Sequence, residues 1–264
     1  MKHWYEERPR ADIKACLLIV HGAGEHAARH LTVARHFAAA GYYVGLGDLP
    51  GYGLADGKRG HIDSFQTYVD TVAAWADNMQ KALPNVPRFI LGHSMGGLIT
   101  ARYMEQQPDI AWHGVLLSAP CFALALPVPS WKKRLAAILQ YWWPTLRFHN
   151  GIVVDDLCRD SEVRSKYKND PLVENKVSVK WYYELQQAMT QVHQEVSRFK
   201  VPVWILQGGA DRIVDPAATR SWYERLNVSD KQLVWIEDGY HELLQDDGKE
   251  KLMQKMLLWT ENHI

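Results

Sequence analysis

The sequence lacks the features that mark several classes of protein. Its 264 residues contain 30 Lys and Arg against 30 Asp and Glu, so the formal net charge is zero. Without a basic excess, the chain has no strong field to attract a polyanion, and we expect no nucleic-acid partner. No apolar run approaches the roughly 18 residues of a membrane span, and the N-terminal MKHWYEERPRADIK carries charges where a secretory signal needs apolar residues. We expect a cytoplasmic protein.

Cysteine is also scarce. Cys16, Cys121 and Cys158 are odd in number and lack the spacing of metal ligands. They therefore indicate neither a disulfide framework nor a zinc site, and they fit a reducing compartment. Nothing in the sequence indicates an oligomeric state.

What the sequence has is a regular alternation of short apolar runs and longer helical patterns. Continuous apolar runs are typical of strands buried on both faces of a mostly parallel sheet. The alternation predicts a doubly wound α/β fold. The expected strands are 15–20, 42–47, 88–92, 114–118, 202–207 and 232–237, and the expected helices are near 27–40, 64–82, 95–107, 216–226 and 247–262.

One interval breaks this alternation. Between the strand ending near Ser118 and the one beginning near Val201 lie about 80 residues, far more than a crossover of roughly 30. We expect a core of residues 1–120 and 196–264 with an inserted helical cap at 121–195.

Two helices are predicted in the cap. The first begins near Ser130, with Lys132, Lys133 and Arg134 near its start and apolar residues after it, and the second follows Ser178, a residue suited to an N-cap. We expect the tryptophans, leucines and prolines of the cap either to line an acyl-chain channel or to pack the cap onto the core. The basic helix start is suited to anionic headgroups at a membrane surface.

The motif Gly92-His93-Ser94-Met95-Gly96 follows a predicted strand and leads into a predicted helix. A G-x-S-x-G match alone arises by chance in about one of ten or more chains of this size. The strand-turn-helix setting is more specific, because it is the setting of a nucleophile elbow. We predict Ser94 as the nucleophile.

A serine hydroxyl needs a base and an acid that orients the base. Asp211 follows the penultimate predicted strand and His241 follows the last, in the chain order Ser, Asp, His of α/β-hydrolases. Asp215 is a weaker candidate acid, because its place before Pro216 suits an N-cap. Asp238 lies too near the end of the last predicted strand to be preferred as the acid. His93 adjoins Ser94 and is interpreted as structural.

Two main-chain donors must stabilise the oxyanion. Met95, after the nucleophile, and Ala23, in the loop HGAGEH at 21–26, are the predicted pair. A glycine-rich loop of this kind can also cradle phosphate, but neither a P-loop nor G-x-G-x-x-G is present. Glu25 and Arg29 stand four residues apart, which permits an ion pair that holds this loop; the alternative is a solvated helix start.

Seven segments of the sequence resemble, in order, the blocks of the monoacylglycerol lipase and lysophospholipase family of serine α/β-hydrolases. They are HGAGEH, GDLPGYG, RGHIDSF, LGHSMGG, SAP, GGADRIVDP and GYHELLQD. The resemblance extends from His21 to Asp246. It implies an α/β-hydrolase fold, Ser94, Asp211 and His241 as triad, and Ala23 and Met95 as oxyanion hole. The short N-terminal segment implies reduced or absent edge strands, and Gly51-Tyr52-Gly53 departs from the family's usual Gly-His-Gly.

The resulting hypothesis is hydrolysis of monoacylglycerol or lysophospholipid esters through an acyl-enzyme, with no metal or organic cofactor required. The same triad also serves carboxylesterases, thioesterases, acyltransferases and peptidases. A ligand receptor on a hydrolase scaffold is the alternative from another class, and the complete triad weighs against it.

Overall fold

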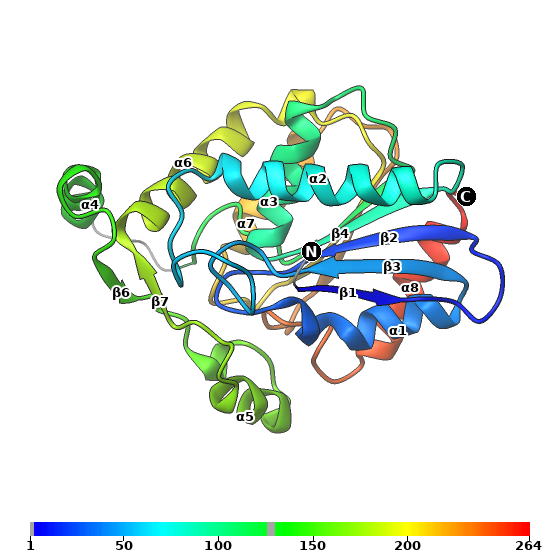
Figure 1. Ribbon diagram of the computed structural model, residues 1–264, viewed down its shortest axis with the longest axis horizontal. Coiled ribbons are helices and arrows are strands. Elements are labelled where there is room, and N and C mark those ends of the chain that lie inside the picture. The colour runs from blue at the N-terminus through cyan, green and yellow to red at the C-terminus, as the bar shows by residue number, and fades with distance from the viewer. Residues whose placement is uncertain (1–2, 126–129) are drawn as a thin grey trace.

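The structure, a computed structural model, describes residues 3–125 and 130–264 and, of residues 130–133, the backbone alone. A seven-stranded sheet lies at its centre (Figure 1). β1 pairs antiparallel with β3, and all other neighbours in this sheet are parallel. Across the sheet the order is β1 (Trp4–Glu7), β3 (Tyr42–Gly47), β2 (Ala15–Val20), β4 (Arg88–His93), β5 (Gly114–Ser118), β8 (Val203–Gly208) and β9 (Lys231–Ile236).

All six predicted strands are confirmed, each to within one residue at either end. The first strand of the chain, β1, is not predicted by any pattern. It is a four-residue edge strand with charged, partly exposed side chains, so it has no apolar run to reveal it.

Helices cover both faces of the sheet. Their apolar side chains form two clusters of buried residues, one on each face of the sheet. α2 (Gln66–Ala82), α3 (Met95–Gln106), α6 (Val179–Gln194) and α7 (Pro216–Arg225) contribute to one cluster, and α1 (Leu31–Ala39) and α8 (Lys249–Glu261) to the other. The helix expected at 27–40 is divided into a 3-10 turn, η1 (Ala27–His30), and α1.

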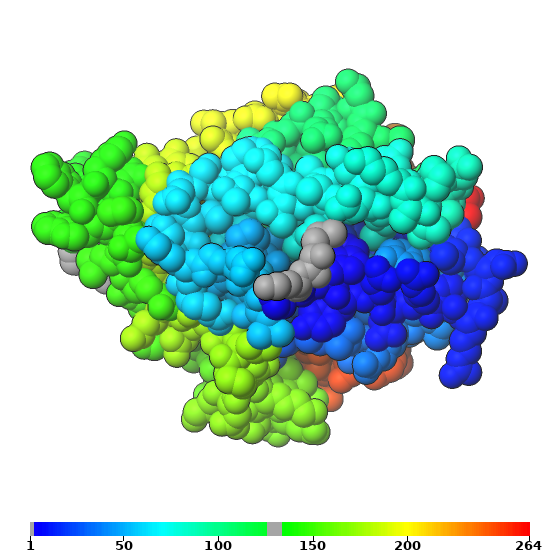
Figure 2. All heavy atoms as spheres, viewed as in Figure 1, coloured from blue at the N-terminus to red at the C-terminus, as the bar shows by residue number. Residues whose placement is uncertain are grey.

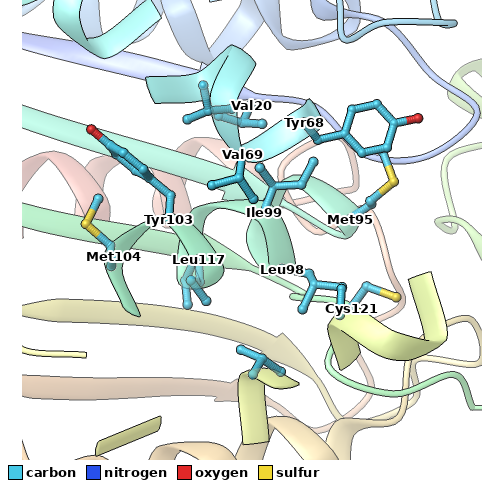
Figure 3. Packing of buried hydrophobic residues seen from close by; sticks show 14 of the residues in the cluster. Val20, Tyr68, Val69, Met95, Leu98, Ile99, Tyr103, Met104, Leu117 and Cys121 are labelled. Carbon is cyan, nitrogen blue, oxygen red and sulfur yellow. The ribbon is translucent and has the colours of Figure 1, made fainter. Parts of the chain in front are cut away.

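The first cluster extends along α3 as far as the turn that precedes this helix. Tyr103 and Met104 lie at one end of the view in Figure 3, and Met95 and Cys121 lie at the other. Since Met95 follows Ser94 directly, the end of the cluster that contains Met95 packs beneath the turn of the predicted nucleophile.

The long interval between β5 and β8 forms an insertion beyond the carboxyl ends of the parallel strands (Figure 1). It contains α4 (Ser130–Trp142), β6 (Arg147–His149), η2 (Val154–Asp156), α5 (Ser161–Asn169), β7 (Lys176–Ser178), α6 and η3 (Val196–Arg198). Both helices predicted there are present, and the side chain of Ser178 caps α6 by accepting the N–H of Trp181 at 3.1 Å. The sequence does not predict the antiparallel pair β6–β7 or α5, because these elements are short and largely polar or exposed.

Among residues 3–125 and 130–264, no helix has the length and apolar character needed to cross a membrane.

Candidate active site

Ser94 lies in the turn between β4 and α3, with φ 53° and ψ −119°. Such a backbone conformation costs a non-glycine residue about 1–3 kcal/mol, and it persists where surrounding contacts enforce it. Here the Ser94 N–H donates to the carbonyl of Ser118 at 3.0 Å, and the Ser94 carbonyl accepts the N–H of Cys121 at 2.9 Å. The end of β5 and the start of the insertion therefore fix the turn from both sides.

Two glycines permit the chain to pack closely around this turn. A Cβ at Gly96 would lie 2.1 Å from the carbonyl oxygen of Val20 and 2.5 Å from that of His21. A Cβ at Gly22 would lie 3.0 Å from the Cβ of Ser94. The predicted oxyanion loop at 21–26 and the turn at Ser94 are thus in direct contact, and this contact requires residues without side chains.

Asp211 and His241 are brought together from the loops after β8 and β9. His241 Nδ1 lies 2.7 Å from Asp211 Oδ2. The other oxygen, Oδ1, accepts the main-chain N–H groups of Ile213 and Val214 at 2.9 and 3.0 Å. The carboxylate is therefore held by its own loop while it binds the imidazole, as the orienting acid of a triad must.

The charge of this pair follows from its surroundings. Burial lowers the pKa of His241, but the Asp211 carboxylate outweighs burial, with a further contribution from Glu242, so the net pKa is raised. Burial acts in the opposite sense on Asp211, and His241 together with the two loop N–H groups brings its pKa below the ordinary value. The geometry thus supports an ionised Asp211 beside a basic imidazole.

Ala23, Ser94 and Met95 all line one cavity of about 670 Å³. This volume is within the range of about 300–1,000 Å³ usual for small-molecule sites. The predicted nucleophile and both predicted oxyanion residues therefore meet at one space. Most of the other lining side chains are apolar and come from the insertion: Leu124, Leu135, Ala136, Leu139, Leu146, Phe148, Val153, Val177, Val179, Trp181, Tyr182 and Leu185.

His93 is buried close to the predicted base. Its ring centroid lies 5.0 Å from that of His241 and 5.6 Å from that of His30. Its Nδ1 lies 3.2 Å from the carbonyl oxygen of Ser118, and burial lowers its pKa to about 3. A neutral imidazole bonded to the main chain is consistent with the structural interpretation of His93.

Asp215 is the N-cap of α7, as its sequence position predicts. Its side chain accepts the N–H of Ala217 at 2.9 Å, and Pro216 occupies the first turn. This bond occupies Asp215 at a helix terminus, whereas Asp211 is the carboxylate that contacts His241.

The predicted contact between Glu25 and Arg29 is present and buried. Arg29 Nε lies 3.1 Å from Glu25 Oε2, with the two side chains 9% and 5% exposed. The alternative of a solvated helix start is therefore wrong. Arg29 also contacts both oxygens of Glu242, at 2.8 and 2.7 Å.

The sequence did not identify Glu242, the second partner of Arg29, or the buried His21 as part of the site. His21 Nε2 accepts the Leu49 N–H at 2.9 Å, and Nδ1 lies 2.8 Å from the Gly22 carbonyl. Burial lowers the pKa of His21 to about 4, in keeping with a neutral ring held between two main-chain groups. The only sequence signal for Glu242 is its place directly after His241, because its partner Arg29 is distant in the chain.

The expectations for the cap tryptophans are only partly met. Trp181 lines the cavity. Trp142 and Trp143 are 75% and 64% exposed, so they neither line the cavity nor pack against the core. Trp142 is the last residue of α4, and Trp143 follows it. The side chains of Lys132 and Lys133, Pro127 and Pro129 lie outside the described part of the structure.

Within the described residues, no group of three or more His, Cys, Asp or Glu side chains is placed to hold a metal ion. The three cysteines are free and buried.

Comparison with known proteins places the chain. Residues 11–248 match the model of the family Hydrolase_4, described as "Serine aminopeptidase, S33". The chain belongs to this family. Its relatives include "Phospholipase YtpA" of Bacillus subtilis, 33% identical over 99% of both chains. The "Monoglyceride lipase" of Homo sapiens is 31% identical over 92% of this chain and 79% of that protein.

Among solved structures, the monoacylglycerol lipase of Paleococcus ferrophilus superposes on this Hydrolase_4 member with a TM-score of 0.89. The two chains are 32% identical, and the match covers 99% of each. The predicted α/β-hydrolase fold and the predicted family are confirmed.

Proposed function

We propose that this protein is a serine hydrolase that cleaves acyl esters carrying one long acyl chain, with monoacylglycerols and lysophospholipids as the substrate class. The observation that carries the proposal is that Ser94, at a strained elbow, opens into a cavity of about 670 Å³ walled mainly by apolar side chains. An acyl chain fits such a wall, and the ester group then lies at the serine. The names of the relatives, monoglyceride lipases and a phospholipase, support the same class.

In the proposed reaction, the Ser94 hydroxyl attacks the acyl carbonyl while His241 takes its proton. Asp211 orients the imidazole and stabilises its cationic form, as the 2.7 Å contact supports. The N–H groups of Ala23 and Met95 bind the oxyanion. His241 returns the proton to the leaving alcohol, and water then releases the fatty acid from Ser94.

The division into a core of residues 1–120 and 196–264 and a cap of 121–195 belongs to this proposal. The cap supplies most of the apolar wall, whereas the core supplies the reacting groups. Leu135, Ala136 and Leu139 show how: they lie on one face of α4 and line the cavity. Substrate preference therefore depends chiefly on the cap, and reaction type on the core.

The exposed apolar side chains at the end of α4 support transient contact with a lipid surface. Ile138, Tyr141 and Trp142 of α4, and Trp143 directly after it, are 59–79% exposed. Figure 2 shows this segment protruding at the edge of the molecule. Exposed apolar clusters of this kind are typical of interaction sites, and tryptophan and tyrosine favour the membrane interface. Substrate would pass from the lipid into the cavity, which Leu135, Ala136 and Leu139 of the same helix line.

A mass-spectrometric panel tests the substrate class. Release of fatty acid is compared for monoacylglycerols, lysophospholipids, diacyl phospholipids, acyl thioesters and short-chain esters. We expect the highest kcat/KM with the single-chain esters, because one chain fills the cavity. Preference for thioesters, or transfer of the acyl group to an alcohol in place of water, would establish one of the alternative activities of the same triad.

A further inference from the structure

Arg29 connects two loops that the proposed function needs, and its partner Glu242 lies 213 residues away in the sequence. One is the loop after β2, which carries Ala23, and the other is the loop after β9, which carries His241. The Arg29 side chain is 9% exposed and contacts a carboxylate from each loop. It is therefore placed between the oxyanion side and the base side of the site.

On the oxyanion side, Glu25 transmits the contact to the main chain. Its Oε2 accepts Arg29 Nε at 3.1 Å, and its Oε1 accepts the N–H of Gly22 at 2.6 Å. Gly22 directly precedes Ala23. His30 Nε2 lies 2.9 Å from the same Oε1. The orientation of the peptide next to the proposed donor is thus fixed by a carboxylate that Arg29 holds.

On the base side, Glu242 follows His241 directly. Both of its oxygens contact Arg29 Nη2, and its N–H donates to the carbonyl of Leu157 at 2.7 Å. Gln245 reinforces the contact, because its side-chain amide donates to the Arg29 carbonyl at 2.6 Å. The segment from His241 to Gln245 is therefore attached to the helical turn that carries Arg29.

Residues of the insertion also contact Arg29 and the loop that carries Ala23. The ring of Tyr167, on α5, lies with its centroid 4.7 Å from Arg29 Cζ. The Glu174 N–H donates to the carbonyl of Gly24 at 2.8 Å, next to Ala23. Arg29 thus lies where the two loops meet the α5 part of the insertion.

The electrostatics match this geometry. Burial opposes the charge of Arg29, but Glu242 and Glu25 outweigh it and raise its pKa, so the guanidinium is always charged. Burial likewise opposes the charge of Glu25, yet His30 and Arg29 hold its pKa well below the ordinary value. A planar guanidinium can bond two carboxylates in separate directions at once, which an ammonium cannot reproduce.

We propose that Arg29 is a positioning residue that sets the oxyanion loop and the His241 loop relative to one another, through Glu25 and Glu242. The inference rests on the proposed roles of Ala23 and His241. Arg29 touches no reacting atom; it acts through these two carboxylates. A role in stability alone would leave the pH profile and the kcat of the folded variant unchanged.

The pH readout follows from the groups that face His241. Loss of the Glu242 charge removes a group that raises the pKa of His241, so in E242Q the acid limb of kcat/KM moves to lower pH. The unpaired charge of Arg29 acts in the same sense. The titratable groups around His241 are Asp211, Glu242, Glu25 and His93. Those around Glu242 are Arg29, Glu25, His241, Tyr167 and Cys158.

The experiment compares R29M, R29K, E242Q and the double variant R29M/E242Q on a soluble p-nitrophenyl ester. For R29M we expect kcat to fall about 10- to 100-fold with little change in KM, because small misplacement of reacting groups has costs of this order. R29K should recover only part of the loss. E242Q should shift the acid limb down by about 1 pH unit. The double variant should be less impaired than the product of the single effects, because R29M alone leaves the buried charge of Glu242 unpaired and the double variant removes that charge.

The matched control is R102M. Arg102 is 5% exposed and contacts Glu105 at 2.6 Å and Glu195 at 3.3 Å, within α3 and at the end of α6. Its loss should lower the melting temperature without moving kcat or the pH profile. Melting curves of all variants show which of them are folded at the assay temperature.

Unchanged kcat in folded R29M, or an unmoved acid limb in E242Q, would overturn the inference. If R29M does not fold, E242Q and R29K decide it by the same two readouts. Failure of the proposed function looks different, because wild type would then neither hydrolyse the ester nor react with a fluorophosphonate at Ser94.

Discussion

His241 and Asp211 form a buried pair with 2.7 Å between Nδ1 and Oδ2, and the second Asp211 oxygen is held by the N–H groups of Ile213 and Val214. D211N keeps the shape of the side chain but removes the charge that fixes the imidazole tautomer. We expect kcat to fall roughly 10³- to 10⁴-fold. Steady-state hydrolysis of a p-nitrophenyl ester measures it. D215N is the control, because asparagine caps α7 as well as aspartate does, and it should retain full kcat.

The pH dependence of the wild type follows from the raised pKa of His241. A general base works in its neutral form, so activity rises as pH passes through this pKa from below. The acid limb of kcat/KM should therefore have its midpoint above the ordinary value of about 6.5. In D211N the residual activity should show a midpoint below that of the wild type, since burial then acts without the Asp211 charge. A midpoint that stays in place would show that another group titrates.

The packing at Gly96 predicts a large loss on adding one methyl group. The Cβ of G96A would lie 2.1 Å from the Val20 carbonyl oxygen, so β2 and α3 must separate. We expect the free energy of unfolding to fall by about 3 kcal/mol, and esterase activity to fall with it. Urea denaturation measures the first quantity.

G248A is the matched variant for Gly96. Gly248 has φ +81°, but a Cβ placed on it would have no heavy atom within 4 Å, so only backbone strain of about 1–2 kcal/mol applies. Its activity should remain. Equal stability losses in the two variants would show that the contact with Val20 does not constrain the elbow.

The exposed tryptophans predict a split between lipid-borne and soluble substrates. The double variant W142S/W143S removes two side chains that are 75% and 64% exposed. Vesicle affinity should fall about tenfold or more, since burial of one large apolar side chain contributes about 1.5–3 kcal/mol. Liposome flotation and KM for vesicle-borne monoacylglycerol measure the effect, and kcat on a short soluble ester should not change.

L258S serves as control for the surface effect. Leu258 is 52% exposed on α8, at the other end of the molecule from α4. If it weakens flotation as strongly as the tryptophan variant, general hydrophobicity rather than α4 governs the binding. If wild type does not float with neutral or anionic vesicles, the proposed surface contact is wrong.

The sequence predicted the core of the fold well because its central strands are buried on both faces. ACLLIV at Ala15–Val20 is entirely buried, and its apolar run has no other simple explanation. β1, β6 and β7 contain charged or exposed residues, and their pairing partners lie far away in the chain. Periodicity cannot reveal elements whose stability comes from distant partners.

In the candidate site, too, some residues could be predicted from the sequence and others could not. Ser94, Asp211 and His241 stand at strand ends, where chain order and turn chemistry predict them. Glu242 was missed because its partner Arg29 is distant in sequence and only the fold joins them. The exposure of Trp142 was also missed, because an apolar residue in a helix pattern does not reveal which side of the helix faces solvent.

The most direct test of the central claim is the mass of the protein after reaction with a fluorophosphonate, followed by peptide mapping. We expect one adduct, on Ser94, formed together with complete loss of esterase activity. We also expect no adduct and a turnover lower by several orders of magnitude in folded S94A. An S94A protein that hydrolyses the ester at the wild-type rate, or a wild type labelled at another residue, would contradict this claim.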